Sequence, residues 1–156
     1  MDSNEDILKN IYLFAKFSED EIEAIASKVQ HIVLNQREVL FSSGNTASSF
    51  YVVRYGTLKI VTNTKDGDDV NLTTISAGDH FGELPFLDGE KRSASVEAVE
   101  KTELLEITYS DLQSVLSSSI EMEKKFYKAI SSYLVKRMRL LTTDLTYARE
   151  LKKRYT

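Results

Sequence analysis

Hydrophobic and polar residues change their spacing twice along this 156-residue chain. Between residues 7 and 15 apolar side chains recur at helical spacing, which predicts a first helix. Ser18 is a good N-cap residue, and Glu21 stands three positions later, so this capping-box pattern should begin a second helix. Its apolar stripe continues to Val29, and we expect the helix to end near Gln30.

From residue 31 the apolar positions follow the shorter period of β-strands. Turn signals rich in Gly, Asn and Asp separate most of these runs. The pattern predicts strands over residues 31–34, 38–41, 50–54, 57–62, 70–75, 93–99 and 103–108. Seven or eight short strands at such spacing favour a sandwich or a barrel over βαβ units.

The last third of the chain returns to a helical pattern. A short helix is expected from Tyr109 through Leu116, and from about Ile120 onward the chain has no Gly or Pro, which predicts one long helix. Five of its residues step by four and three in turn, the rhythm of a coiled-coil seam: Leu134, Met138, Leu141, Leu145 and Ala148. At 1.5 Å per residue, about 35 residues form a rod of roughly 50 Å, longer than the barrel could cover. We therefore expect a parallel homodimer through this helix; the alternative is a stripe that packs on the helix's own barrel.

Composition narrows the possible functions. The chain has no cysteine, which excludes disulfides, thiolate catalysis and iron–sulfur sensing. Its acidic N-terminus lacks the features of a signal peptide, and no apolar run approaches the roughly 18 residues that a membrane span needs. We expect a cytoplasmic protein without membrane contact. The two histidines, His31 and His80, are too few for a metal site and are interpreted as core or surface residues.

Charge is unevenly distributed along the chain. Residues 1–120 hold 20 acidic and 10 basic side chains, whereas residues 121–156 hold 4 acidic and 10 basic ones. This asymmetry is interpreted as a solvated helix face that balances an acidic body. A surface for an acidic partner or a nucleic acid is the alternative, although no nucleic acid is expected.

Candidate chemistry concentrates in residues 81–96, which read FGELPFLDGEKRSASV. Gly82 lets the backbone approach a ligand closely, and Glu83 supplies an acceptor for a sugar hydroxyl. Pro85 suits the first turn of a short helix whose N-terminus attracts an anion. Arg92 brings the forked donors that match a phosphate, and Ser93 adds a hydroxyl beside them. Together these groups suit a small ligand with a sugar at one end and a phosphate at the other.

This segment resembles the phosphate-binding cassette of the cyclic nucleotide-binding domain family: Phe-Gly-Glu-Leu, a short helix, then Arg-Ser-Ala-Ser-Val. The resemblance extends over almost the whole chain, from Leu13-Phe14 before the second helix to the terminal helix. It implies a mainly β fold, a double-stranded β-helix (jelly-roll) barrel with N-terminal helices and a long C-terminal helix. Pro85 departs from the family pattern, because it removes one backbone donor for the phosphate.

The resemblance also implies a ligand, cAMP more than cGMP, and a role for each site residue. Glu83 would accept the ribose 2′-hydroxyl with help from the Gly82 backbone, and Arg92 would pair with the cyclic phosphate. Ten residues would form the site: Gly82, Glu83, Leu84, Arg92, Ser93 and Ala94 around the sugar and phosphate, Ile60 and Leu72 against the base, and Thr142 and Thr143 from the long helix. No catalytic residue, metal or further cofactor is implied.

The resulting prediction is a regulatory module, with the barrel and N-terminal helices at residues 1–119 and the long helix at residues 120–156. A cyclic nucleotide would bind and move that helix, which changes contact with a second copy or an unidentified effector protein. Two alternatives stay open. Glu83 and Arg92 could pair in a domain that has lost its ligand and serves as an interaction module. The chain could be a fragment of a longer transcription regulator, channel or kinase. An enzyme is not expected, because no nucleophile–base pair is visible.

Overall fold

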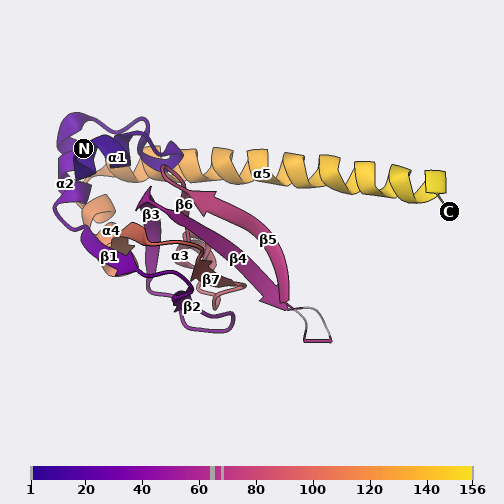
Figure 1. The fold of residues 1–156 in the computed structure, drawn as a ribbon. Coiled ribbons are helices and arrows are strands. Elements are labelled where there is room, and N and C mark those ends of the chain that lie inside the picture. Colours follow the sequence, from indigo (N-terminus) through magenta and orange to yellow (C-terminus); the bar gives the residue numbers. More distant parts are fainter. Residues whose placement is uncertain (1, 64–65, 68, 156) are drawn as a thin grey trace.

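The structure is a computed structural model that describes residues 2–63, 66–67 and 69–155, without the side chains of residues 69, 71, 72 and 155. Two antiparallel four-stranded sheets form a jelly-roll body, and helices cover one side of it (Figure 1). One sheet has the order β1-β8-β3-β6: Gln30–Leu34, Thr102–Thr108, Ser49–Tyr55 and His80–Phe81. The other has the order β2-β7-β4-β5: Val39–Phe41, Ser95–Ala98, Thr57–Asn63 and Asp69–Ser76. The predicted fold class is confirmed; the two-residue strand β6 was not predicted.

The first predicted helix is two elements, so the expectation of one helix over residues 7–15 was wrong. α1 (Asn4–Lys9) has its C-cap at Asn10, and a 3-10 turn, η1 (Tyr12–Phe14), follows after the extended residue Ile11. Leu8, Ile11 and Leu13 are all buried. One continuous helix would point Leu13 away from the face that Leu8 and Ile11 share. The break therefore lets every apolar residue of this segment reach the core.

The second helix, α2 (Glu19–Ala26), begins where the sequence predicts. The Ser18 amide donates to Glu21 Oε1 at 2.8 Å, and the Glu21 amide donates to Ser18 Oγ at 3.3 Å, which completes the capping box. The helix ends at Ala26, earlier than expected, because Gln30 already belongs to β1.

Strand β3 lies between two separate hydrophobic clusters. Phe50 and Val52 face the helices, where they pack with the apolar faces of α1, η1, α2, α4 (Tyr109–Ser117) and α5 (Ile120–Tyr155). Tyr51 and Val53 point to the opposite side, into the barrel interior between the sheets. Alternate residues of a strand face opposite sides, so the uninterrupted apolar run of β3 is explained by burial on both faces.

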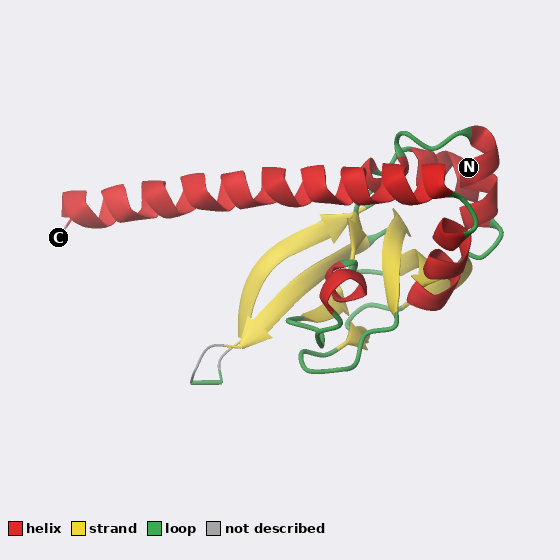
Figure 2. Ribbon diagram, turned by 180° about the vertical axis from the view of Figure 1, so that it is seen from behind, coloured by secondary structure: helices red, strands yellow, loops and turns green. Residues whose placement is uncertain are grey.

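The long helix α5 covers the body with its first half only. Met122, Phe126 and Ile130 are buried against the helical cluster. The rest of the helix extends away from the barrel as a rod (Figure 2). In the part of the chain that the structure describes, no helix combines the length and the apolar character required to cross a membrane.

Candidate ligand-binding cavity

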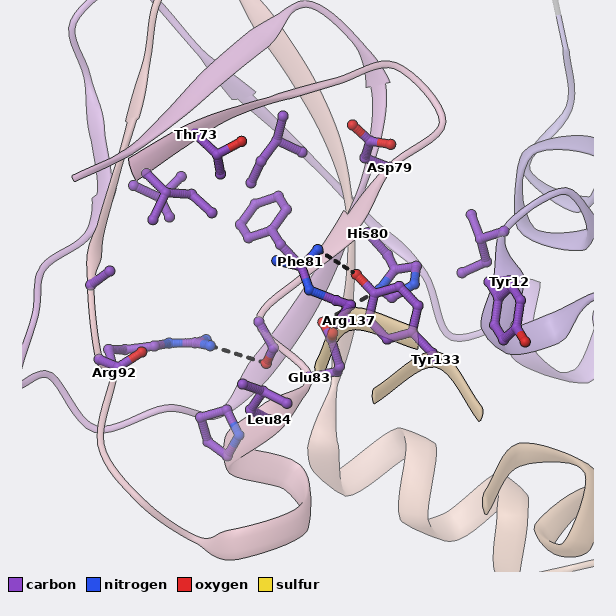
Figure 3. A pocket seen from close by; sticks show the side chains of 18 of the residues that line it. Tyr12, Thr73, Asp79, His80, Phe81, Glu83, Leu84, Arg92, Tyr133 and Arg137 are labelled. Carbon is purple, nitrogen blue, oxygen red and sulfur yellow. Dashed lines mark hydrogen bonds and ion pairs between the residues drawn. The ribbon is translucent and has the colours of Figure 1, made fainter. Parts of the chain in front are cut away.

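A cavity of about 420 Å³ opens between the barrel, the N-terminal turn and α5. Its size falls within the roughly 300–1,000 Å³ of small-molecule sites. The cassette segment forms one wall, and Tyr12 from η1 together with Tyr133 and Arg137 from α5 lie on the opposite side (Figure 3). Distant parts of the sequence thus contribute to one cavity.

Gly82 is required where the cassette begins. Its backbone has φ +85°, and an added Cβ would lie 2.9 Å from Nη1 of Arg92. A side chain at this position would therefore be strained and would also push against the guanidinium. The Gly82 carbonyl accepts hydrogen bonds from Arg92 Nη1 at 3.1 Å and from the Tyr109 hydroxyl. This close contact holds the two ends of the cassette together.

Arg92 is only 6% exposed and lies along the cavity wall. Its Nη2 donates to the carbonyl of Ser49 at 2.6 Å, and the guanidinium carbon lies 4.0 Å from the centre of the Phe41 ring. Its backbone exchanges hydrogen bonds with Gly44 and Asn45. The side chain is therefore held in place without a carboxylate partner, and its Nε has no hydrogen-bond partner at all.

Glu83 is also 6% exposed and stands immediately before the short helix α3 (Leu84–Asp88). Its Oε2 lies 3.4 Å from Nδ1 of His80, within ion-pair distance but without hydrogen-bond alignment. Burial acts to raise the pKa of the Glu83 carboxyl, but His80, the Glu83 backbone N–H and the positive charge of Arg137 together outweigh it. The net result is a pKa below the usual value. Glu83 is thus a buried, ionised acceptor, and it is not paired with Arg92.

The unsatisfied polar atoms of the protein gather in this cavity. Among the described residues, three buried side-chain nitrogen or oxygen atoms lack a hydrogen-bond partner: His80 Nδ1, Glu83 Oε2 and Arg92 Nε. All three belong to residues that line the cavity. Buried polar groups are almost always paired, so each exception requires an explanation. A polar ligand in the cavity is the simplest explanation for all three.

The structure brings most of the predicted site residues together. Seven of the ten line the cavity: Ile60, Gly82, Glu83, Leu84, Arg92, Ser93 and Ala94. The side chain of Leu72 lies outside the described residues. Thr142 and Thr143 are exposed on the free part of α5, where their hydroxyls donate to the carbonyls of Met138 and Arg139. Within one chain, this structure does not place them at the cavity.

The contribution of α5 comes instead from residues that the sequence did not single out. The Tyr133 ring packs on His80 with centroids 4.7 Å apart, and its hydroxyl accepts from Arg137 Nη1 at 3.2 Å. Burial, followed by the charge of Glu83, raises the pKa of Tyr133. The four-residue spacing of Tyr133 and Arg137 puts them on one helix face. Nothing in that spacing shows where the face meets the barrel.

The jelly-roll barrel, the buried polar side chains of Glu83 and Arg92 in the cassette and the helix beside the cavity are typical of a class of small-ligand-binding regulatory domains. Comparison with known proteins identifies the family. The family model described as the cyclic nucleotide-binding domain matches residues 31–119. The chain belongs to this family.

Curated relatives extend the comparison. A cAMP-dependent protein kinase regulatory subunit from Blastocladiella emersonii is 28% identical over 120 residues, which cover 77% of this chain and 30% of that protein. The Cyclic AMP receptor protein of Thermus thermophilus is 29% identical over 109 residues, which cover 70% of this chain and 50% of that protein. The chain thus spans half or less of the length of these relatives.

Solved structures agree with the fold. The catabolite activator protein of Thermus thermophilus superposes with a TM-score of 0.76 at 27% identity, covering 86% of this chain and 61% of that one. The N-terminal domain of a transcriptional regulator from Streptomyces coelicolor superposes with a TM-score of 0.78 at 25% identity, covering 87% of this chain and 95% of that one.

Proposed function

We propose that this domain binds a cyclic nucleotide in the cavity, with cAMP as the expected ligand, and signals through α5. The observation that carries the proposal is the set of three buried atoms without a hydrogen-bond partner among the described residues, all in residues that line one cavity. A ligand with a sugar hydroxyl and a phosphate offers a donor for Glu83 and an acceptor for Arg92. No catalytic step is needed for this function.

Each cassette group has a role in the proposed complex. Glu83, ionised and buried, accepts a ribose hydroxyl, because a carboxylate in a shielded site is a strong acceptor. Arg92 presents its free Nε to the cyclic phosphate while Nη2 keeps its bond to Ser49. Ser93 and Ala94 lie next to it along the cavity wall, and Ile60 lines the same space as an apolar surface for the base.

The choice of cAMP rests on the relatives. Those named above are described as a regulatory subunit of a cAMP-dependent kinase and as a cyclic AMP receptor protein. Ser93, the hydroxyl residue after the cassette arginine, is compatible with either purine. Both nucleotides therefore belong in the first experiment.

α5 is suited to report whether the cavity is occupied. Tyr133 and Arg137 lie on the cavity wall, so a ligand contacts or displaces them and favours one helix position over another. Beyond them, three residues of the predicted seam are exposed by 60% or more: Met138, Leu141 and Leu145. We propose that a second copy covers this stripe in a parallel coiled coil. A longer protein, such as a transcription regulator, channel or kinase, could carry the domain and use the same helix as its output.

The experiment is a thermal melt of the purified chain with increasing cAMP or cGMP. A ligand that binds the folded state stabilises it by mass action and so raises the melting temperature. At a ligand concentration of one hundred times Kd, the free energy of unfolding rises by about 2.7 kcal/mol. Arg92→Ala should remove the shift, whereas the exposed neighbour Lys91→Ala should keep it. No shift with either nucleotide at millimolar concentration would contradict the proposal and favour an interaction module that has lost its ligand.

A further inference from the structure

His80 stands apart from the predicted site residues, because the cassette pattern does not require it and yet it lies beside the central acceptor. It belongs to the short strand β6, and its side chain is 5% exposed. Its Nδ1 faces Glu83 Oε2 at 3.4 Å, and neither atom has a hydrogen-bond partner. On the other side, the ring of Tyr133 from α5 packs against the imidazole (Figure 3).

Arg137 acts on Glu83 by charge without forming an ion pair with it in the described part of the chain. Arg92, on the same wall, uses its guanidinium for the carbonyls of Gly82 and Ser49. Among the described residues, His80 is the one basic group within ion-pair distance of the Glu83 carboxylate. A buried carboxylate without a partner is costly. The orientation and the charge of this acceptor therefore depend on His80.

We propose that His80 is a positioning residue for Glu83 and that its protonation couples cyclic-nucleotide binding to pH. This inference rests on the proposed function, because it concerns the same cavity. Histidine is the side chain whose charge ordinarily changes between pH 5 and 8. At 3.4 Å a protonated His80 attracts the carboxylate by charge, whereas a neutral ring has no charge to offer.

The direction of the effect follows from desolvation. A ligand that fills the cavity removes water from Glu83, so the carboxylate then needs its cation more than in the open cavity. The charge of the phosphate is balanced by Arg92 on the same wall, so the effect on His80 acts through Glu83. Binding should therefore draw a proton onto His80, and affinity should rise as the pH falls from 8 to 6.

The surroundings of His80 contain groups of both signs. Asp79 and Glu83, on its own segment, are acidic, and Arg137 from α5 is basic; all three line the same cavity. Among the described residues, Tyr133 from α5 and Tyr12 from η1 also bring phenol groups to this wall. Of these charged groups, Glu83 is the one within ion-pair distance of His80, at 3.4 Å.

The test is isothermal titration of the full chain with cAMP and cGMP at pH 6, 7 and 8, in two buffers of different ionisation enthalpy. We expect binding several-fold tighter at pH 6 than at pH 8, within the tenfold per pH unit that uptake of one proton allows. The buffer dependence of the heat should show proton uptake. The phosphodiester keeps a constant charge over this range, so the slope reports the protein.

Two matched variants test whether the pH dependence of the affinity comes from His80. His80→Asn keeps an amide donor near the position of Nδ1 but cannot titrate, so its affinity should lose the pH dependence and match the parent at pH 8. His31→Asn is the control, because His31 pairs with Glu103 at 2.6 Å and does not line the cavity; it should keep the slope.

The outcomes separate the two proposals. If the parent chain takes up a proton when it binds the nucleotide, the result supports the role of His80. This holds even where His80→Asn is too unstable for the calorimetric measurement. Parent affinity that is constant from pH 6 to 8, without proton uptake, contradicts it and leaves the proposed function intact. The absence of binding at every pH contradicts the proposed function and this inference with it.

Discussion

The two halves of α5 follow one helical pattern but lie in different environments. In the first half Phe126 and Ile130 are 0% and 1% exposed, and they pack on the core that α1, α2 and β3 also build. In the second half Met138 and Leu141 are 65% and 60% exposed. Tyr133 and Arg137, where the halves meet, line the ligand cavity. The comparison separates a half that is buried against the body from a half that is exposed, with residues of the cavity wall at their junction.

The largest expected difference between the halves concerns stability. Ile130→Ala removes a fully buried side chain and should lower the free energy of unfolding by about 2–5 kcal/mol, because the lost packing leaves a cavity. Leu141→Ala, a truncation of similar size, should change it by no more than about 0.5 kcal/mol when the chain is monomeric. Urea denaturation at low protein concentration measures both. Equal losses would show that the distal half is packed on its own body.

The next expected effect concerns association. Leu141→Asp places a charge in the middle of the proposed seam and should raise the dimer Kd at least about a hundredfold, equivalent to roughly 2.7 kcal/mol. Thr146→Asp is the control, since this exposed residue lies off the seam. Sedimentation velocity at micromolar concentration measures the mass of each variant. A parent chain that is already monomeric with and without nucleotide would contradict the proposed dimer.

The cassette and the long helix also differ in how well the sequence predicted them. Gly82, Glu83 and Arg92 could be identified from sequence, because the conformation of Gly82 and the close contact with Arg92 are encoded within a dozen residues. The sequence did not show which groups Glu83 and Arg92 contact. In the structure Glu83 faces His80, and Arg92 donates hydrogen bonds to backbone carbonyls. Those contacts depend on the strand pairing of β6 with β3, which the sequence did not show.

For α5 the sequence predicted the element but not its placement. Thr142 and Thr143 were chosen by resemblance, whereas Tyr133 and Arg137 reach the cavity. The position of the helix along the barrel is set by its packing on η1, where the rings of Tyr12 and Tyr133 are 5.8 Å apart. η1 forms because the first predicted helix breaks after Asn10, and the sequence pattern did not show this break. The periodicity of α5 alone therefore could not reveal where α5 lies on the barrel. The roles of Thr142 and Thr143 stay predictions.

The central claim is that occupancy of the cavity is reported by α5. Amide hydrogen exchange of the full chain with and without saturating cAMP tests it most directly, because it follows both regions in one measurement. We predict slower exchange in residues 80–84 and 92–96, together with altered exchange in α5 from Tyr133 onward, and neither change in Arg92→Ala. Protection of the cavity walls with unchanged exchange throughout α5 would contradict the account.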